Sequence, residues 1–156
     1  MKTTIEMKNT IEKEVLLQAP VSKVWRALTD YKQFGEWFGW KIEAPFAPGK
    51  VAGGILSCGG EEHKGRYEMT VQKIEPETYF SYSWHPYAFD PAVDYSKEPP
   101  TLIEFRLQPK GEGTLLSVKE SGFDKLSRQR LEEAFPKNEG GWQGQLENIQ
   151  KYVERD

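Results

Sequence analysis

The sequence has very few of the residues that build metal sites and disulfides, and it has no long apolar run. Cys58 is the single cysteine, and the two histidines are His63 and His85. One cysteine excludes an internal disulfide and suits a reducing compartment, so cytoplasmic residence is expected. The histidines fall on different predicted strands, and Cys58 has no CxxC or HxxxH partner, so no metal site is expected.

Targeting signals and membrane spans are missing as well. The polar opening "MKTTIEMKNTIEKE" has no apolar core of a signal peptide, and no apolar run reaches the roughly 18 residues that a membrane-spanning helix needs. Basic tracts are also absent, because 21 lysines and arginines are interspersed with 24 acidic residues. We therefore expect no membrane insertion and no nucleic-acid partner.

Cofactor and nucleophile motifs are not found either. The glycine-rich stretch "GGILSCGGEE" matches neither the P-loop nor the dinucleotide fingerprint. No GxSxG sequence is present, and neither histidine has an evident serine or cysteine partner. The sequence thus predicts no cofactor and names no catalytic residue.

What the chain does have is length and aromatic residues. A chain of 156 residues fits one domain with a sizeable core, and aromatic residues make up 13% of it. We expect a flexible N-terminal segment over residues 1–8 and a single domain over residues 9–156.

The first half predicts a strand, two short helices and then more strands. "TIEKEVLLQAP" alternates apolar and polar residues as a half-buried strand does, and Pro20 ends it. "PVSKVWRALTD" has helical spacing, and Asp30 can cap a second short helix, "YKQFGEWF". Because Gly35 strains this second helix, its aromatic end is expected to be loop-like.

Five or six strands are expected next. They include "GKVAGGILS", "HKGRYEMTVQKIEPE", "TYFSYSWHP", "TLIEFRLQP" and "GTLLSVKES", of which the last two should pair as a hairpin across "KGEG". The proline-rich "YAFDPAVDYSKEPP" between them is predicted to be a long loop.

The C-terminal third has helical periodicity. Its apolar stripe consists of Leu131, Phe135, Trp142, Leu146, Ile149 and Val153. The stripe keeps one phase across Pro136, which favours one kinked helix or two nearly coaxial ones. The element order predicts an α+β fold in which a curved antiparallel sheet wraps around the long C-terminal helix.

Three segments resemble a known superfamily. "LLQAPVSKVWRALTDYKQFGEWFGW", "GTLLSVKESGF" and "NEGGWQGQLENIQKYVE" are similar to the START-like helix-grip (SRPBCC, Bet v 1-like) superfamily. The branch is that of the C-terminal domain of the activator of Hsp90 ATPase, and the resemblance covers roughly residues 9 to 154. It implies a deep apolar cavity between the sheet and the long helix. Function is less constrained, because the superfamily includes lipid carriers, hormone receptors, cyclases and co-chaperone domains.

Candidate ligand-binding residues follow from strand parity and the helix stripe. The aromatic segment "FGEWFGWKIEAPF" could simply pack as core with Trp25, or it could close one end of a cavity. We expect Trp25 in the core and the later aromatic residues at the wall. The full candidate set is Trp37, Phe38, Trp40, Tyr67, Met69, Tyr82, Trp84, Phe105, Glu120, Trp142, Leu146 and Ile149.

Two features of this set sharpen the prediction. Glu120 shares strand parity with Leu116 and Val118, so it should face the cavity, where burial would raise its pKa; the alternative is a strand end in solvent. Glycines flank Trp142 where the helix meets the sheet, so either the backbones close up or a void remains.

Three functions are compatible with the sequence. The first is non-enzymatic binding of a small hydrophobic or aromatic molecule, by a monomer or homodimer. The second is a co-chaperone-like module that contacts a chaperone such as Hsp90 through its outer surface and takes part in a stress response. The third is a cyclase, dehydratase or hydrolase, which needs a polar pair in the cavity such as Glu120 with Tyr67 or His85.

Overall fold

The computed structural model describes residues 9–57 and 65–155. Over this range the chain forms a seven-stranded antiparallel sheet in the order β1-β7-β6-β5-β4-β3-β2. The strands are β1 Thr10–Leu17, β2 Trp40–Ile42, β3 Val51–Leu56, β4 Gly65–Glu75, β5 Tyr79–Trp84, β6 Thr101–Lys110 and β7 Gly113–Ser121. The flexible segment predicted over residues 1–8 lies outside the described residues, as do Cys58 and His63.

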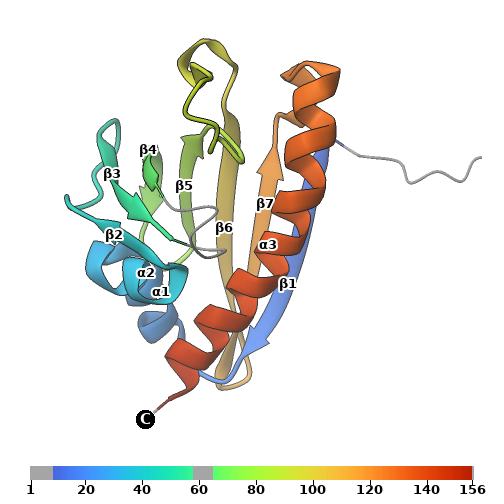
Figure 1. Ribbon diagram of the computed structural model, residues 1–156. Coiled ribbons are helices and arrows are strands. Elements are labelled where there is room, and N and C mark those ends of the chain that lie inside the picture. Colours follow the sequence, from blue (N-terminus) through green and yellow to red (C-terminus); the bar gives the residue numbers. More distant parts are fainter. Residues whose placement is uncertain (1–8, 58–64, 156) are drawn as a thin grey trace, which may run out of the picture.

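Helices cover one face and one end of the sheet. They are α1 Val21–Thr29, α2 Tyr31–Phe38 and the long α3 Arg128–Glu154, with short 3₁₀ turns η2 Tyr95–Lys97 and η3 Phe123–Lys125. Figure 1 shows α3 running across the β6–β7–β1 half, while α1 and α2 lie together beside β2. The predicted α+β helix-grip fold is confirmed.

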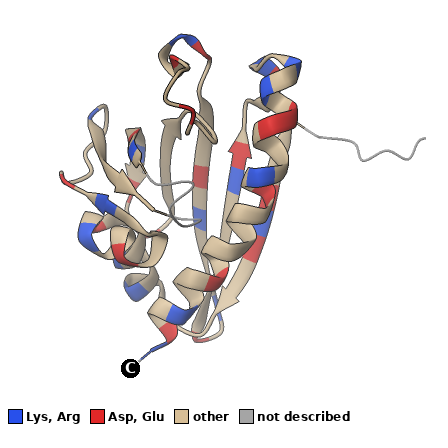
Figure 2. Ribbon diagram, viewed as in Figure 1, with Lys and Arg blue, Asp and Glu red and all other residues tan. Residues whose placement is uncertain are grey.

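Charges of both signs are spread over these elements. The ribbon in Figure 2 shows acidic and basic residues interspersed along α3 and the strands. No helix among the described residues is both long enough and apolar enough to span a bilayer.

The second helix differs from its prediction. α2 continues to Phe38 and ends at Gly39, whose φ of 89° is the left-handed conformation that closes many helices. A Cβ on Gly35 would lie 2.2 Å from the backbone oxygen of Trp40, so this glycine lets α2 press against β2. The expectation of a loop-like end was wrong, because the glycine serves a close contact.

We expect Gly35→Ala to lower the free energy of unfolding by about 1–3 kcal/mol, because the helix must move away from β2. Urea denaturation measures this. The matched control is Gly140→Ala on α3, where a Cβ meets nothing within 4 Å. This control should be neutral or stabilising, since alanine is the better helix former. Equal stability of Gly35→Ala and the parent chain would contradict the contact.

The long helix carries its stripe into the core. α3 is a single helix that contains Pro136, and Ser127 caps it by accepting a hydrogen bond from the Arg130 N–H at 3.2 Å. Leu131 is partly buried, and the other stripe residues are buried, namely Phe135, Trp142, Leu146, Ile149 and Val153. The prediction of one helix rather than two unrelated helices is confirmed.

Strand parity holds where the candidate residues lie. Tyr67 and Met69 face inward on β4, and the register shift between Val71 and Lys73 comes only after them. After this shift the inward-facing parity changes by one residue, so that Ile74 is partly buried and Lys73 is exposed. The β6–β7 hairpin also forms as predicted.

Candidate functional site

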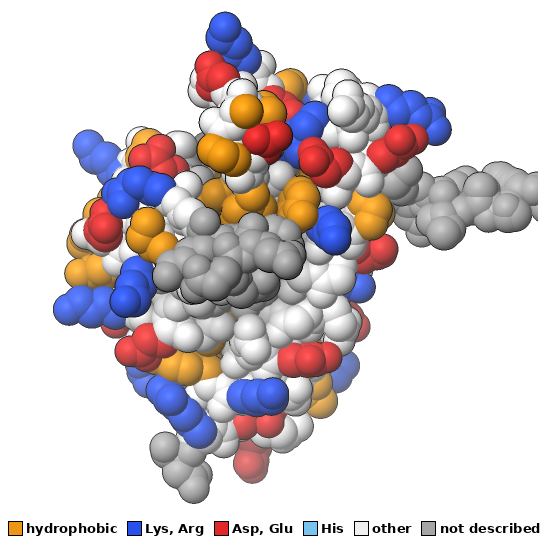
Figure 3. Space-filling model, in the orientation of Figure 1, with side chains coloured by type: hydrophobic (Ala, Val, Ile, Leu, Met, Phe, Trp, Pro, Cys, Tyr) orange, Lys and Arg blue, Asp and Glu red, His pale blue; other side chains and the backbone are white. Residues whose placement is uncertain are grey.

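A cavity of about 340 Å³ lies between α3 and the aromatic half of the sheet. Its apolar lining comes from the end of α2, three strands, the β5–β6 loop and α3: Phe38, Leu56, Tyr67, Trp84, Tyr87, Phe89 and Trp142. The helix side adds Lys137, Asn138, Gly141, Gly144, Gln145 and Asn148. In Figure 3 hydrophobic side chains gather on this face below the loop at the top, with a basic side chain beside them.

Aromatic rings form one continuous wall of the cavity. Phe38, Trp84 and Trp142 contact one another, with ring centroids 6.0–6.1 Å apart. Tyr67 meets Trp84 edge-on at 5.5 Å and stacks on Phe89 at 5.4 Å. Rings in mutual contact hold one another in place, so the wall is preorganised.

The glycines of α3 leave space at this wall. A Cβ at Gly141 or Gly144 would meet no atom within 4 Å, and both glycines line the cavity. Of the two alternatives for the glycines beside Trp142, the void therefore remains and the backbones do not close up.

Glu120 lies in the core with no exposed surface. Its Oε1 accepts from the Trp142 indole N–H at 2.8 Å, and its Oε2 accepts from the Trp84 indole at 2.9 Å. Thr101 Oγ1 donates at 2.6 Å, and the Asn138 amide donates to both oxygens at 3.0 and 3.2 Å. One carboxylate thus fixes the two tryptophans of the cavity wall.

The environment of Glu120 changes its ionisation. Burial raises the pKa of Glu120 above its ordinary value. The hydrogen bonds from four neutral donors lower the pKa, but by less than burial raises it. The alternative of a strand end in solvent was wrong, since parity with Leu116 and Val118 turned the side chain inward. Glu120 is not among the cavity-lining residues, and it acts on the cavity through the indoles.

Amide side chains join α2 to α3 at the cavity. The buried Gln145 donates from Nε2 to the Phe38 backbone oxygen at 3.0 Å. Its Oε1 accepts from Asn148 Nδ2 at 3.1 Å. These bonds hold Phe38 against the helix, and its ring therefore stays in the wall.

The loop between β5 and β6 is fastened at its base by Tyr67. The Tyr67 hydroxyl donates to the His85 backbone oxygen and accepts from the Ala88 N–H at 3.1 Å. This anchor fixes the chain on either side of Tyr87, so Tyr87 and Phe89 keep their places in the lining.

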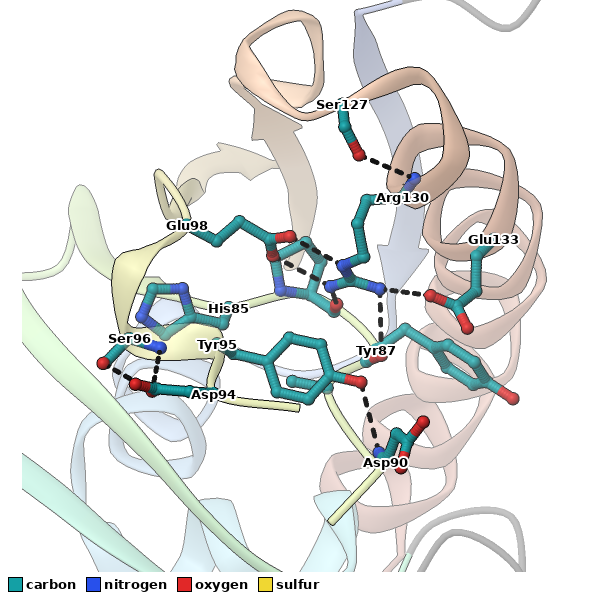
Figure 4. Close-up of polar contacts among 12 residues, drawn as sticks. His85, Tyr87, Asp90, Asp94, Tyr95, Ser96, Glu98, Ser127, Arg130 and Glu133 are labelled. Carbon is teal, nitrogen blue, oxygen red and sulfur yellow. Dashed lines mark hydrogen bonds and ion pairs between the residues drawn. The ribbon is translucent and has the colours of Figure 1, made fainter. Parts of the chain in front are cut away.

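Arg130 fastens the same loop to α3 (Figure 4). Its guanidinium makes a bidentate pair with Glu98 at 2.7 and 2.9 Å, bonds Glu133 at 2.6 Å and donates to the Pro86 oxygen at 2.5 Å. It also lies 4.7 Å from the ring centroid of Tyr95. The side chains of Arg130 and Glu98 are 13% and 14% exposed, so salt screens this pair only weakly.

The predicted site residues divide into two groups. The cavity brings together Phe38, Tyr67, Trp84 and Trp142. The core around it takes up Trp37, Trp40, Met69, Tyr82, Phe105, Glu120, Leu146 and Ile149.

Two tryptophans differ from their predicted places, and neither lines the cavity. Trp37 is 5% exposed and donates its indole N–H to the Ala27 oxygen at 2.8 Å, away from the cavity lining. Trp25, expected in the core, is only partly buried at its edge.

Sequence reasoning missed much of the polar lining. Asn138, Gln145 and Asn148 lie at helical spacing beside the apolar stripe, and this pattern could have identified them. Tyr87 and Phe89 lie in an irregular loop, where no periodicity marks them. Over the described ranges no cluster of three or more metal-ligating side chains occurs.

Comparisons with known proteins agree with this architecture. A family model described as "Activator of Hsp90 ATPase homolog 1-like protein" matches residues 18–154. Comparison with curated proteins finds no match.

Solved structures share the fold along nearly the whole chain. Protein MLL2253 from Mesorhizobium loti is 27% identical, with a TM-score of 0.73 over 94% of this chain and 97% of that one. CalU16 from Micromonospora echinospora is 23% identical, with a TM-score of 0.66 over 93% and 74%. The Aha1 dimer from Colwellia psychrerythraea is 16% identical, with a TM-score of 0.69 over 93% and 96%.

Proposed function

The chain belongs to the activator of Hsp90 ATPase homolog 1-like family of the SRPBCC superfamily, and from this premise we propose that it binds a small hydrophobic or aromatic molecule in the cavity beneath α3. The observation that carries the proposal is the aromatic-walled cavity of about 340 Å³. This volume is near the lower end of the roughly 300–1,000 Å³ that small-molecule pockets occupy. A compact ligand therefore fits better than a long-chain lipid.

Catalysis is less well supported than binding. The enzymatic alternative needs Glu120 as an acid or base that reaches a substrate. This carboxylate has no exposed surface, and its oxygens accept hydrogen bonds from the wall tryptophans, Thr101 and Asn138. These contacts suit a structural acceptor, so binding without chemistry is the function we favour.

We expect Gly144→Leu to abolish uptake of the neutral dye N-phenyl-1-naphthylamine, because a leucine side chain would occupy the cavity. Dye fluorescence measures uptake, and circular dichroism confirms the fold. Gly140→Leu is the matched control: it makes the same change on α3 at a glycine outside the lining, and it should leave uptake unchanged. Equal dye binding by the Gly144→Leu variant would place uptake elsewhere.

A co-chaperone-like role is the second candidate, and the family match is the observation that favours it. Such a role would use the outer surface, and the face drawn in Figure 3 carries both acidic and basic side chains. A pull-down with Hsp90 and an ATPase assay separate the two candidates. If the Gly144→Leu variant still binds Hsp90 and still stimulates its ATPase activity, the result would support a surface role independent of the cavity.

A further inference from the structure

We propose that the ligand of this cavity is a small planar aromatic anion, whose rings lie on the tryptophan wall and whose acidic group pairs with Lys137. This inference rests on the proposed binding function and adds the chemical class of the ligand.

The charge comes from one side chain. Lys137 is the charged residue among the described lining residues, and no described carboxylate lines the cavity. Its ammonium lies 5.9 Å from the ring centroid of Tyr87, and none of the ion pairs within residues 9–57 and 65–155 includes Lys137. Glu133, one turn earlier on α3, bonds Arg130 instead. Lys137 therefore offers a positive charge to the cavity that no carboxylate among the described residues neutralises.

The neighbouring amides do not provide an equivalent anchor. Asn138 gives its amide N–H groups to Glu120, and Asn148 donates to Gln145, which in turn donates to Phe38. Each of these amides thus has at least one N–H engaged in holding the wall together. A ligand's acidic group consequently finds its strongest available donor in the Lys137 ammonium, since charge-assisted hydrogen bonds are stronger than neutral ones.

The wall favours a flat ring over a cation. Aromatic cages for ammonium groups place rings around a space that the cation fills. Here the rings of Phe38, Trp84 and Trp142 contact one another at 6.0–6.1 Å, so they leave no such space between them. They present faces and edges on which another ring can pack. The positive charge of Lys137 also opposes a cationic ligand.

The nearest buried acid does not reverse this preference. The two indoles of Trp84 and Trp142 contact Glu120 with their N–H edges, so this carboxylate lies behind the aromatic wall as seen from the cavity. Its oxygens accept hydrogen bonds from Trp84, Thr101, Asn138 and Trp142, so they are turned toward these donors and away from the ligand.

Titration calorimetry at pH 7 tests the inference with three matched probes: 2-naphthoate, neutral 2-naphthamide and cationic 2-naphthylmethylammonium. The native chain should bind naphthoate most tightly and the ammonium most weakly. Lys137→Gln should raise the Kd of naphthoate about threefold to fivefold, as expected for an ion pair with an exposed lysine. Naphthamide should keep its Kd within about twofold, because it makes no ion pair. Lys151→Gln, which removes the same charge from the exposed end of α3, is the control and should change nothing.

Each outcome has a distinct meaning. Binding of all three probes with equal Kd, or naphthoate binding unaffected by Lys137→Gln, overturns the anion preference and leaves the binding function standing. Tightest binding of the ammonium also overturns it. Failure of every probe together with N-phenyl-1-naphthylamine overturns the binding function itself. Lys137→Glu gives a second reading, since it should reverse the order of naphthoate and the ammonium.

Discussion

Trp142→Ala is expected to lower the free energy of unfolding by about 3–5 kcal/mol, because it removes a large ring from a packed core. Trp142 is 3% exposed and meets Phe105 edge-on at 5.8 Å, in addition to its contacts with Phe38 and Trp84. The substitution also takes one donor from Glu120. Lost packing and a lost buried hydrogen bond act in the same direction.

Guanidinium denaturation followed by far-ultraviolet circular dichroism measures this loss. Trp25→Ala is the control, because Trp25 is only partly buried and should cost much less. A loss below about 1 kcal/mol for Trp142→Ala would show that α3 does not cover the core, since even a smaller core truncation costs more.

The second large effect is expected at Glu120. Glu120→Leu should lower the free energy of unfolding by about 2–4 kcal/mol, because it leaves the buried donors of Trp84 and Trp142 without an acceptor. The indole N–H can only donate, so neither ring can find a substitute bond with its neighbour. Denaturation at pH 7 measures the loss, and an unchanged or more stable variant would show that the indoles do not depend on the carboxylate.

The same residue predicts a pH dependence. The folded-state pKa of Glu120 is raised above its ordinary value of 4.5, mainly through burial. The stability that this group contributes is therefore fully present below the unfolded pKa and is lost as pH rises through the folded pKa. Stability measured against Glu120→Gln should consequently fall as pH increases from 4.5. If the stability of the native chain relative to Glu120→Gln grew as the pH increased, the result would contradict a raised pKa of Glu120.

The fold was predictable because each main element carries its own periodicity. Alternation marked β1 and the central strands, and the stripe around Trp142 marked α3 even across Pro136. The short strand β2 was not predicted, because three residues are too few to show alternation. The end of α2 was predicted wrongly for a related reason. Gly35 allows a close contact with the backbone of Trp40, and such a contact depends on how the chain packs rather than on the local helix propensity.

The site was predictable only where it follows these periodicities. Parity placed Tyr67 and Trp84 on the inner face, and both are buried; Glu120, for which parity left a solvent-exposed strand end as an alternative, is buried as well. The partners of Glu120 come from β5, β6 and α3, and no local pattern specifies which inward residue meets which. The same holds for Arg130 and Glu98, whose bidentate pair joins a loop to a helix.

The pairing of the first strand with the last has a consequence for how the chain is made. β1 pairs along its whole length with β7, from Thr10 opposite Ser121 to Leu17 opposite Thr114. During synthesis β1 leaves the ribosome about a hundred residues before its partner, which at roughly 5–20 residues per second is a wait of many seconds. Ile11 and Leu17, both buried in the folded chain, have no sheet to cover them in that interval. Because such non-local pairing must await β7, the domain completes its core only after β7 has been made, and the incomplete domain exposes apolar surface that favours aggregation until then.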